Sequence, residues 1–390
     1  MFMTEKRFIP YGRQSISEED IAAVVEVLRS DWLTQGPAVE HFEKAVADYC
    51  GARYAVAVAN GTAALHLCAM AAGFGPGDEV ITSPITFVAS ANCIAYVGAT
   101  PVFADIDPQS YCIDPAQVQA KISPDTRGII PVHFAGQPCD MGSIATMAKD
   151  RGLKIIEDAA HAIGASYEVA GETFKVGCCA HSDMTIFSFH PVKHITTGEG
   201  GMITTNDPHL YEELLLLRTH GITKDSEKIT NNDGPWYYEQ QALGFNYRIT
   251  DLQCALGSSQ LKRLDSFIAR RRQIVANYNQ AFADCEHLVT PFERVDCHSS
   301  WHLYMLGFKG MDRHRVFERL RGKGLGVNVH YIPVHMQPYY KKHFQTSPGD
   351  YPVAENYYAG IVTMPMFPSM TDEDVQYVIE TVLATVKELA

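Results

Sequence analysis

The sequence predicts an α/β protein, with a mostly parallel β-sheet covered by helices on both faces and a smaller C-terminal α+β part. Short apolar runs alternate with segments of helical periodicity over the first half, which is typical of strand–helix–strand units. Near Thr250 the pattern changes to a long helical segment with isolated strands after it. The chain has 390 residues, enough for two domains. We therefore predict a large domain over residues 1–250 and a small domain over residues 251–390.

Two helices are predicted ahead of the first strand. Ser17 begins a capping sequence, after which apolar residues follow at helical spacing: Ile21, Val24, Val25 and Leu28. A Gly-Pro break at residues 36–37 precedes a second helical set that ends at Gly51, consisting of Val39, Phe42, Val46 and Tyr49.

Runs typical of buried strands then recur along the chain, at residues 54–59, 79–82, 101–104, 128–133, 153–157, 184–189 and 202–205. Helical stretches such as residues 141–149 lie between most of them. Strands that alternate with helices pair in parallel, and such sheets bind ligands beyond the carboxyl ends of their strands. We therefore expect the chemically active residues directly after the strands.

A long helix is predicted over residues 251–279, with the run Arg270-Arg271-Arg272 on its solvent-exposed face and an apolar set at Leu252, Leu256, Leu261, Leu264 and Ile268. Strand-like segments follow at 301–308 and 327–332. The last helix is predicted to begin at a Thr371 cap and to bury one side, formed by Val375, Val378, Ile379, Val382 and Val386.

The composition argues against several classes of protein. The 32 basic and 45 acidic residues give a net charge of −13, so the chain lacks the basic stripe with which proteins bind nucleic acid. Residues 1–7 lack the apolar run of a signal peptide, and the most apolar stretch, residues 54–75, is too interrupted to span a membrane. Ten scattered cysteines without a C-x-x-C pair indicate free thiols in a reducing cytoplasm.

Two polar features follow predicted strands. Asn60-Gly61-Thr62 suits a phosphate, because glycine lets the backbone approach a ligand and amides at a helix start carry partial positive charge. A plain helix N-cap explains these residues equally well. Asp158 follows the run 153–157, and a buried carboxylate there needs a partner, for which a protonated ring nitrogen is suitable. The alternative is that Asp158 caps the turn at residues 159–161.

Ser188 lies at the end of the next run, residues 184–189, and Lys193 follows that run. A lysine is usually a solvated surface residue with a pKa of about 10.4, but in a pocket it can lose its charge and form an imine. Ser188 would offer a hydroxyl to the same anion as residues 60–62. Residues 244–251 interleave polar and aromatic side chains ahead of the long helix, and they would face a ligand or another subunit.

Other histidines and cysteines carry weaker signals. For Cys297, His298 and His302 the sequence offers no further zinc ligand, and the alternation across residues 301–308 favours a strand, so no metal site is predicted. His330 and His335 lie among prolines and aromatic residues, which suits the mouth of a pocket.

The order of five motifs is similar to one family. Asn60-Gly61-Thr62, Asp158-x-x-His161, Ser188-x-x-x-x-Lys193, Glu199-Gly200-Gly201 and Asn246-Tyr247-Arg248 resemble the DegT/DnrJ sugar-nucleotide aminotransferases. These are pyridoxal-phosphate enzymes of the aspartate-aminotransferase fold (PLP fold type I), and the likeness extends from residues 31–37 to residues 329–331. The chain looks most like the branch that aminates C4 of a UDP-linked 4-keto-6-deoxy-N-acetylhexosamine in pseudaminic acid synthesis. His161 is found in that branch, whereas many relatives carry Gln there.

The resemblance implies roles for the matching residues. Lys193 would bind pyridoxal phosphate covalently and act as acid and base, while Asp158 would pair with its ring nitrogen. His161 would lie near the ring hydroxyl. The ring face and the phosphate would be held by Phe87, Gly61, Thr62, Ser188 and, from the partner subunit, Asn246. The sugar nucleotide would contact Tyr11, Asp31, Trp32, Leu33, Thr34, Gly61, Ser188, Asn246, Val329, His330, Tyr331 and Ile332.

The resemblance also implies partners and alternatives. L-Glutamate would donate the amino group and a UDP-keto sugar would accept it in a ping-pong reaction, within a cytoplasmic homodimer whose active sites lie at the subunit interface. One alternative is a different keto sugar, C4 epimer or nucleotide (dTDP or GDP), or amination at C3. Another is a regulatory or binding protein. A related dehydratase branch has His in place of the catalytic Lys, and Lys193 argues against it.

Overall fold

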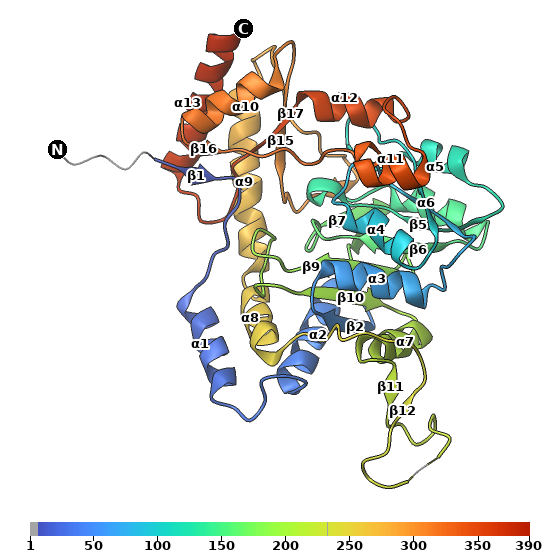
Figure 1. Cartoon of the computed structure of the whole chain (residues 1–390). Coiled ribbons are helices and arrows are strands. Elements are labelled where there is room, and N and C mark those ends of the chain that lie inside the picture. The colour runs from blue at the N-terminus through green and yellow to red at the C-terminus, as the bar shows by residue number, and fades with distance from the viewer. Residues whose placement is uncertain (1–6, 232) are drawn as a thin grey trace.

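The structure, a computed structural model, describes residues 7–231 and 233–390, so residues 1–6 of the stretch compared with a signal peptide lie outside it. At the centre of the described chain is a seven-stranded sheet (Figure 1), in the order β2 (Tyr54–Val58), β10 (Gly201–Thr205), β9 (Met184–Ser188), β6 (Lys154–Asp158), β5 (Thr126–Ile130), β3 (Glu79–Thr82) and β4 (Thr100–Phe103). Strand β10 is antiparallel to both neighbours, and the other neighbouring strands pair in parallel. The predicted mostly parallel sheet is confirmed.

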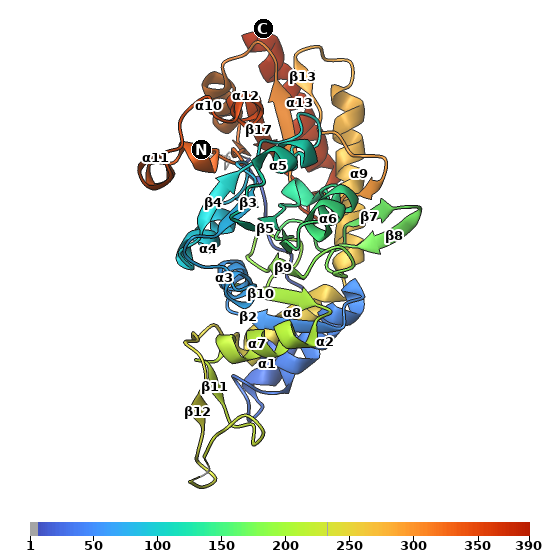
Figure 2. The ribbon, with the colours of Figure 1, turned by 90° about the vertical axis from the view of Figure 1, so that its right-hand side faces the viewer.

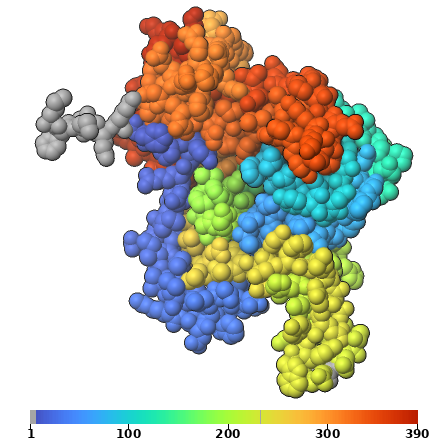
Figure 3. Space-filling view, in the orientation of Figure 1, coloured from blue at the N-terminus to red at the C-terminus, as the bar shows by residue number. Residues whose placement is uncertain are grey.

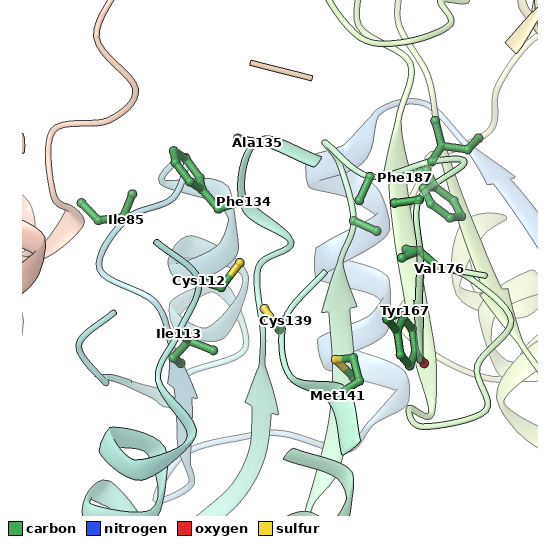
Figure 4. Close-up of a cluster of buried hydrophobic side chains, with 14 of the residues drawn as sticks. Ile85, Cys112, Ile113, Phe134, Ala135, Cys139, Met141, Tyr167, Val176 and Phe187 are labelled. Carbon is green, nitrogen blue, oxygen red and sulfur yellow. The ribbon is translucent and has the colours of Figure 1, made fainter. Parts of the chain in front are cut away.

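Helices cover both faces of this sheet (Figures 1 and 2), because alternate residues of each strand point to opposite sides. Val56 and Val58 of β2 belong to a cluster with helices α3 (Gly61–Ala71), α4 (Ala89–Tyr96) and α7 (Pro208–Arg218). Ala55 and Ala57 belong to a cluster on the other face with α2 (Pro37–Cys50), α5 (Pro115–Lys121) and α6 (Met141–Lys149). In Figure 4 this second cluster reaches up to Phe134 and Ala135, above Cys112 and Cys139.

A separate hydrophobic core lies in the C-terminal part. It joins the sheet β13 (Leu288–Val289), β15 (Tyr304–Phe308) and β17 (Ile361–Met364) to helices α9 (Leu264–Phe282), α10 (Arg313–Gly322) and α13 (Asp372–Leu389). Thr371 caps α13 as predicted, and the predicted apolar side of that helix is buried. Strand β1 (Ile9–Pro10) pairs in parallel with β16 (Leu325–Gly326), so the beginning of the described chain lies with its C-terminal part.

The predicted helix over residues 251–279 is two helices, α8 (Asp251–Leu261) and α9. The chain leaves helical geometry at Arg263, whose guanidinium binds the Asp20 carboxylate and the Ser15 carbonyl. The prediction that Arg271 faces solvent is also wrong. Its side chain is 1% exposed, because its guanidinium reaches three backbone carbonyls in the interior.

One predicted C-terminal strand is shorter than expected, and the other, predicted over residues 327–332, is absent, because β16 ends at Gly326. At residues 301–303 the backbone N–H groups of His302 and Leu303 donate to the Ala135 carbonyl, so β15 begins only at Tyr304. Residues 329–332 form a loop, in which the His330 carbonyl accepts a hydrogen bond from the Tyr357 hydroxyl at 2.7 Å. The remaining elements are β7 (Ser166–Val169), β8 (Glu172–Lys175), β14 (Cys297–His298), the short helices η1 (Phe134–Gly136) and η2 (Val334–Met336), α11 (Pro338–Phe344) and α12 (Pro352–Gly360).

Two segments extend from the body of the molecule. Helix α1 (Glu18–Leu28) begins at the predicted Ser17 capping box, but its expected apolar side is not buried, since Ile21 is 47% and Leu28 57% exposed. The arm that carries β11 (Ile222–Thr223) and β12 (Glu239–Gln240) projects away from the sheet in Figures 1 and 2 and stands out from the rest of the surface in Figure 3. No helix of the described chain is long and apolar enough to cross a bilayer.

Candidate active site

Lys193 lies in the loop that joins the neighbouring strands β9 and β10. Its backbone N–H donates to the His190 carbonyl at 2.8 Å, and the Thr197 N–H donates to the Phe189 carbonyl at 3.0 Å. Burial lowers the pKa of the Lys193 amine to about 8, against the opposing effect of the Asp158 carboxylate. About a tenth of this amine is therefore unprotonated at neutral pH, far more than for a surface lysine.

Asp158 is the last residue of β6 and is 5% exposed. Its Oδ1 accepts from the Ala160 N–H at 3.1 Å, so the expected alternative, a cap of the following turn, is present. Its Oδ2 accepts from the Ser90 hydroxyl at 2.5 Å. These two donors fix the carboxylate beside Lys193. Ser90 comes from the start of α4, and no local signal in the sequence singles it out.

His161 is buried, and its tautomer follows from its partners. Burial, reinforced by the charge of Lys193, holds the pKa of His161 well below its usual range, so the ring is neutral. The Ala135 N–H donates to Nδ1 at 3.3 Å, which leaves the hydrogen on Nε2. Nε2 lies 3.2 Å from the Tyr331 hydroxyl oxygen and donates to it. His161 is therefore set to donate a hydrogen bond at this point.

Aromatic side chains surround these groups. Phe87 is 58% exposed, and its ring centroid lies 6.2 Å from that of Tyr331. The Tyr11 ring lies 5.4 Å from the ring of His330, whose Nδ1 is 2.9 Å from the Thr363 hydroxyl oxygen. Burial and the charge of Lys193 lower the pKa of His330 to about 3. The loop of residues 329–332 thus brings two rings to Lys193 and Asp158, while Ile332 is 48% exposed at its end.

The start of α3 is adjacent to Ser188. The Asn60 side chain accepts from the Ala63 N–H at 2.8 Å, so this residue is the N-cap that the simpler interpretation expected. A methyl group on Gly61 would lie 3.0 Å from Ser188 Cβ. Since the first amides of a helix have no intrahelical partner, Gly61, Thr62 and the Ser188 hydroxyl form a cradle that fits a phosphate. Together with the amine of Lys193 and the carboxylate of Asp158, they fit pyridoxal phosphate.

Other predicted site residues lie elsewhere in the chain. Asn246 pairs with Thr219 at the base of the arm. Thr34 pairs with Thr250 ahead of α8, and two residues beside it are exposed, Trp32 at 54% and Leu33 at 47%. Asp31 is exposed in the same turn. Helix α8, which follows Thr250, contacts the loop that carries Lys193: the Gln253 side-chain amide donates to the Glu199 carbonyl at 2.7 Å.

Two histidines outside the predicted site pack around it. The His302 ring lies 4.4 Å from that of His161 and 5.4 Å from that of His194. The sequence assigned His302 to a strand, and no local signal in the sequence places it beside residue 161. His335, expected at a pocket mouth, is instead fully buried, with Nε2 2.9 Å from Glu355 Oε1. No group of three or more metal-binding side chains occurs among the described residues.

Comparisons with known proteins agree with this geometry. The model of the DegT/DnrJ/EryC1/StrS aminotransferase family matches residues 14–383. The spore coat polysaccharide biosynthesis protein SpsC of Bacillus subtilis (strain 168) is 45% identical over 392 residues, covering 99% of each chain. Among solved structures, Helicobacter pylori PseC, an aminotransferase involved in the biosynthesis of pseudoaminic acid, superposes with a TM-score of 0.89 at 31% identity, covering 98% of this chain and 100% of the other.

The PLP form of the putative sugar aminotransferase Spr1654 from Streptococcus pneumoniae superposes with a TM-score of 0.89 at 31% identity, covering 98% of this chain and 100% of the other. That relative is thus described with the same cofactor that the Lys193 site fits. The fold is that of the fold-type I aminotransferases, with a mixed central sheet. The chain belongs to the DegT/DnrJ/EryC1/StrS family and is a pyridoxal-phosphate-dependent sugar aminotransferase.

Proposed function

We propose that this enzyme moves an amino group from L-glutamate to C4 of a UDP-linked 4-keto-6-deoxy-N-acetylhexosamine, the reaction of the pseudaminic acid pathway. The observation that carries the proposal is the Lys193 amine, kept partly unprotonated by burial beside Asp158 and the donor face of His161. The likeness to PseC along almost the whole chain supports this substrate class.

Pyridoxal phosphate, when bound, supplies the electron sink that weakens the bond between hydrogen and the carbon next to an imine. Lys193 would hold the cofactor through Nζ. As a free amine it would take the proton from the glutamate α-carbon and return one to C4 of the sugar. Asp158, held by Ser90 and the Ala160 amide, keeps the proton on the ring nitrogen. His161, whose Nε2 donates to the Tyr331 hydroxyl in this structure, would donate to the ring hydroxyl oxygen of the cofactor.

The other cofactor contacts come from the ends of α3 and β9. Gly61, Thr62 and Ser188 bind the phosphate, and Phe87 covers one face of the ring. Its 58% exposure supports this role, because a large apolar ring left open at a polar site has a surface to cover. The sugar nucleotide extends from Lys193 along Tyr11 and residues 329–332, with residues 31–34 at its far end.

We propose a homodimer with active sites at the subunit interface. In the single chain a row of large apolar side chains is exposed along α1 and the turn after it, formed by Ile16, Ile21, Leu28, Trp32 and Leu33. The projecting arm exposes another set, Trp236, Tyr238 and Leu243. Exposed apolar groups of this extent mark interfaces. Asn246, at the base of the arm, then reaches the phosphate of the partner's site.

The ten free cysteines, all within the described chain, support a cytoplasmic location.

A second candidate is amination of another nucleotide-linked keto sugar. The identity to SpsC, 45%, exceeds that to PseC, 31%, and the name of SpsC refers to spore coat polysaccharide biosynthesis. This observation favours a different sugar configuration, nucleotide or position within the same chemistry.

One experiment separates the two candidates. The enzyme is incubated with glutamate and, in turn, UDP-, dTDP- and GDP-linked 4-keto and 3-keto sugars, and the position and configuration of the new amine are determined by NMR. The proposal predicts the highest kcat/KM for the UDP-linked 4-keto-N-acetyl sugar, with nitrogen at C4. A higher kcat/KM for another sugar would support the second candidate. Lys193→Ala, assayed with every substrate, serves as the inactive control.

A further inference from the structure

Arg271 of α9 is an unusual residue, because it is a charged side chain 1% exposed that makes no ion pair with the described residues. One guanidinium nitrogen donates to the carbonyls of Trp301, His302 and Met366, at 3.3, 3.0 and 3.1 Å. Its Nε is buried without a partner in the described chain. Burial lowers the pKa of Arg271 to about 10, so it is still charged at neutral pH. A buried charge without a counter-ion lowers the stability of the fold, and an apolar residue at this position would avoid that loss.

Two of the three carbonyls that Arg271 binds, those of Trp301 and His302, belong to a segment in contact with the active site. The backbone carbonyl of the preceding residue, Ser300, accepts a hydrogen bond from His194 Nε2 at 2.9 Å, and His194 directly follows Lys193. The Ser300 hydroxyl donates to the His161 carbonyl at 3.2 Å. The segment of residues 300–303 therefore touches both the lysine loop and the backbone of His161.

A second connection runs through η1. The His302 N–H donates to the Ala135 carbonyl at 2.7 Å. The Ala135 N–H in turn donates to His161 Nδ1, the bond that fixes the hydrogen on Nε2. Ala135 has φ 57°, a conformation that a residue with a side chain adopts only when its neighbours hold it.

The imidazole rings of His161, His302 and His194 also lie close to one another. The His302 ring lies 4.4 Å from that of His161 and 5.4 Å from that of His194. His194 Nδ1 is buried without a hydrogen-bond partner among the described residues, so a second proton on this ring would have no acceptor. The Arg271 guanidinium thus holds the segment that carries His302 and accepts the hydrogen bond of His194. The His161 ring is linked to this segment through Ala135.

We propose that Arg271 is a positioning residue of the active site, which holds residues 300–303 so that Lys193 and the hydrogen-bond donor of His161 keep their catalytic arrangement. Arg271 touches no reacting group and acts through the carbonyls of Trp301 and His302. The role rests on the proposed function of Lys193 and His161, and it is independent of which sugar is the substrate.

The test compares Arg271→Met, which keeps the length of the side chain but loses its donors, with Arg270→Met as matched control. Arg270 precedes it on α9 and also donates to a backbone carbonyl, that of Met370 at 2.7 Å, but it also pairs with the exposed Asp372 and does not reach residues 300–303. Arg271→Lys, which retains a charge but not the planar fork, is the conservative variant.

Three readouts are used. In cofactor-free protein labelled with ¹⁵N-histidine, NMR reports which nitrogen of His161 carries the hydrogen, after assignment with His161→Gln. The visible absorbance of the lysine-bound cofactor gives the pH at which that group titrates. The rate of the single half-reaction with saturating glutamate separates kcat from KM.

We expect Arg271→Met to lose the fixed Nε2 tautomer of His161, to shift the titration of the visible band, and to slow the half-reaction about 100-fold, with KM changed by less than about threefold. Arg271→Lys should fall between it and the wild type, and Arg270→Met should match the wild type in all three readouts.

Circular dichroism and thermal unfolding show whether Arg271→Met folds. If it folds and matches Arg270→Met in all three readouts, the proposal is overturned. If neither Arg271 variant folds, Arg271 is a residue of folding, and the proposal is equally overturned. An inactive wild-type half-reaction with normal NMR and absorbance readouts would instead refute glutamate as the donor.

Discussion

The charge state of Lys193 sets the pH at which the free enzyme takes up its cofactor. Only an unprotonated amine attacks an aldehyde, and burial lowers the pKa of Lys193 to about 8. Because deprotonation rises with pH, we expect the attachment rate to climb about tenfold per pH unit below about 8 and to level off above it. Stopped-flow absorbance after mixing with pyridoxal phosphate measures this profile.

Asp158 provides the matched test of that cause. Its negative charge raises the pKa of Lys193, so Asp158→Asn should move the midpoint of the profile to lower pH. Ser90→Ala removes a hydrogen bond to the carboxylate but keeps its charge, and it should leave the midpoint near about 8. A midpoint that does not move in Asp158→Asn would show that burial alone sets the charge of Lys193.

Among the elements, the meeting of β10 with the start of α3 leaves no room for a side chain. A methyl group on Gly201 would lie 2.5 Å from the Asn60 carbonyl oxygen. We expect Gly201→Ala to lower the free energy of unfolding by about 1–3 kcal/mol and to weaken cofactor binding about tenfold, because the strand must push the phosphate cradle aside.

Gly75→Ala is the control for this change, since nothing lies within 4 Å of the added methyl group. Its free energy of unfolding should stay within about 0.5 kcal/mol of the wild type. Urea unfolding and titration with pyridoxal phosphate measure both quantities. Equal cofactor affinity in the two variants would mean that the cradle tolerates the displacement.

The elements also mark where sequence reasoning succeeds. Local patterns gave the strands of the central sheet and the caps at Ser17 and Thr371, because their causes are close in sequence. Because parallel strands end at a common edge, Asp158 and Lys193 are predicted to lie close together, whereas His161 is predicted beside them only from the family resemblance. Arg271 and His302 were misread, since their partners are carbonyls and rings from distant segments. The break in the long helix depends on the distant Asp20, which binds Arg263.

At the scale of the whole molecule, the proposed exchange of Asn246 between subunits can be tested by complementation. Lys193→Ala and Asn246→Ala are each expected to be nearly inactive. When the two are co-expressed, about half of the dimers are hybrids, and each hybrid contains one complete site if Asn246 serves the partner. Activity should then recover to about a quarter of the wild-type value. No recovery, with hybrids verified by differently tagged subunits, would place Asn246 in the site of its own chain.

The exposed side of α1 makes a separate prediction about assembly. Leu28 is 57% exposed, and Leu28→Glu places a charge in the proposed interface, so sedimentation velocity should detect monomer at concentrations where the wild type is dimeric. Val295→Glu is the control, because Val295 is 99% exposed in a loop away from α1 and the arm. Unchanged dimerisation of Leu28→Glu would exclude α1 from the interface.

The pairing of β1 with β16 bears on biosynthesis. Ile9 meets Leu325, which leaves the ribosome about 300 residues later. At typical elongation rates the first strand waits ~15–60 s for its neighbour. Tyr11, two residues after Ile9, packs on His330, which is translated later still. The nascent polypeptide therefore closes its catalytic pocket only after residue 330 has been added, about 300 residues after Tyr11.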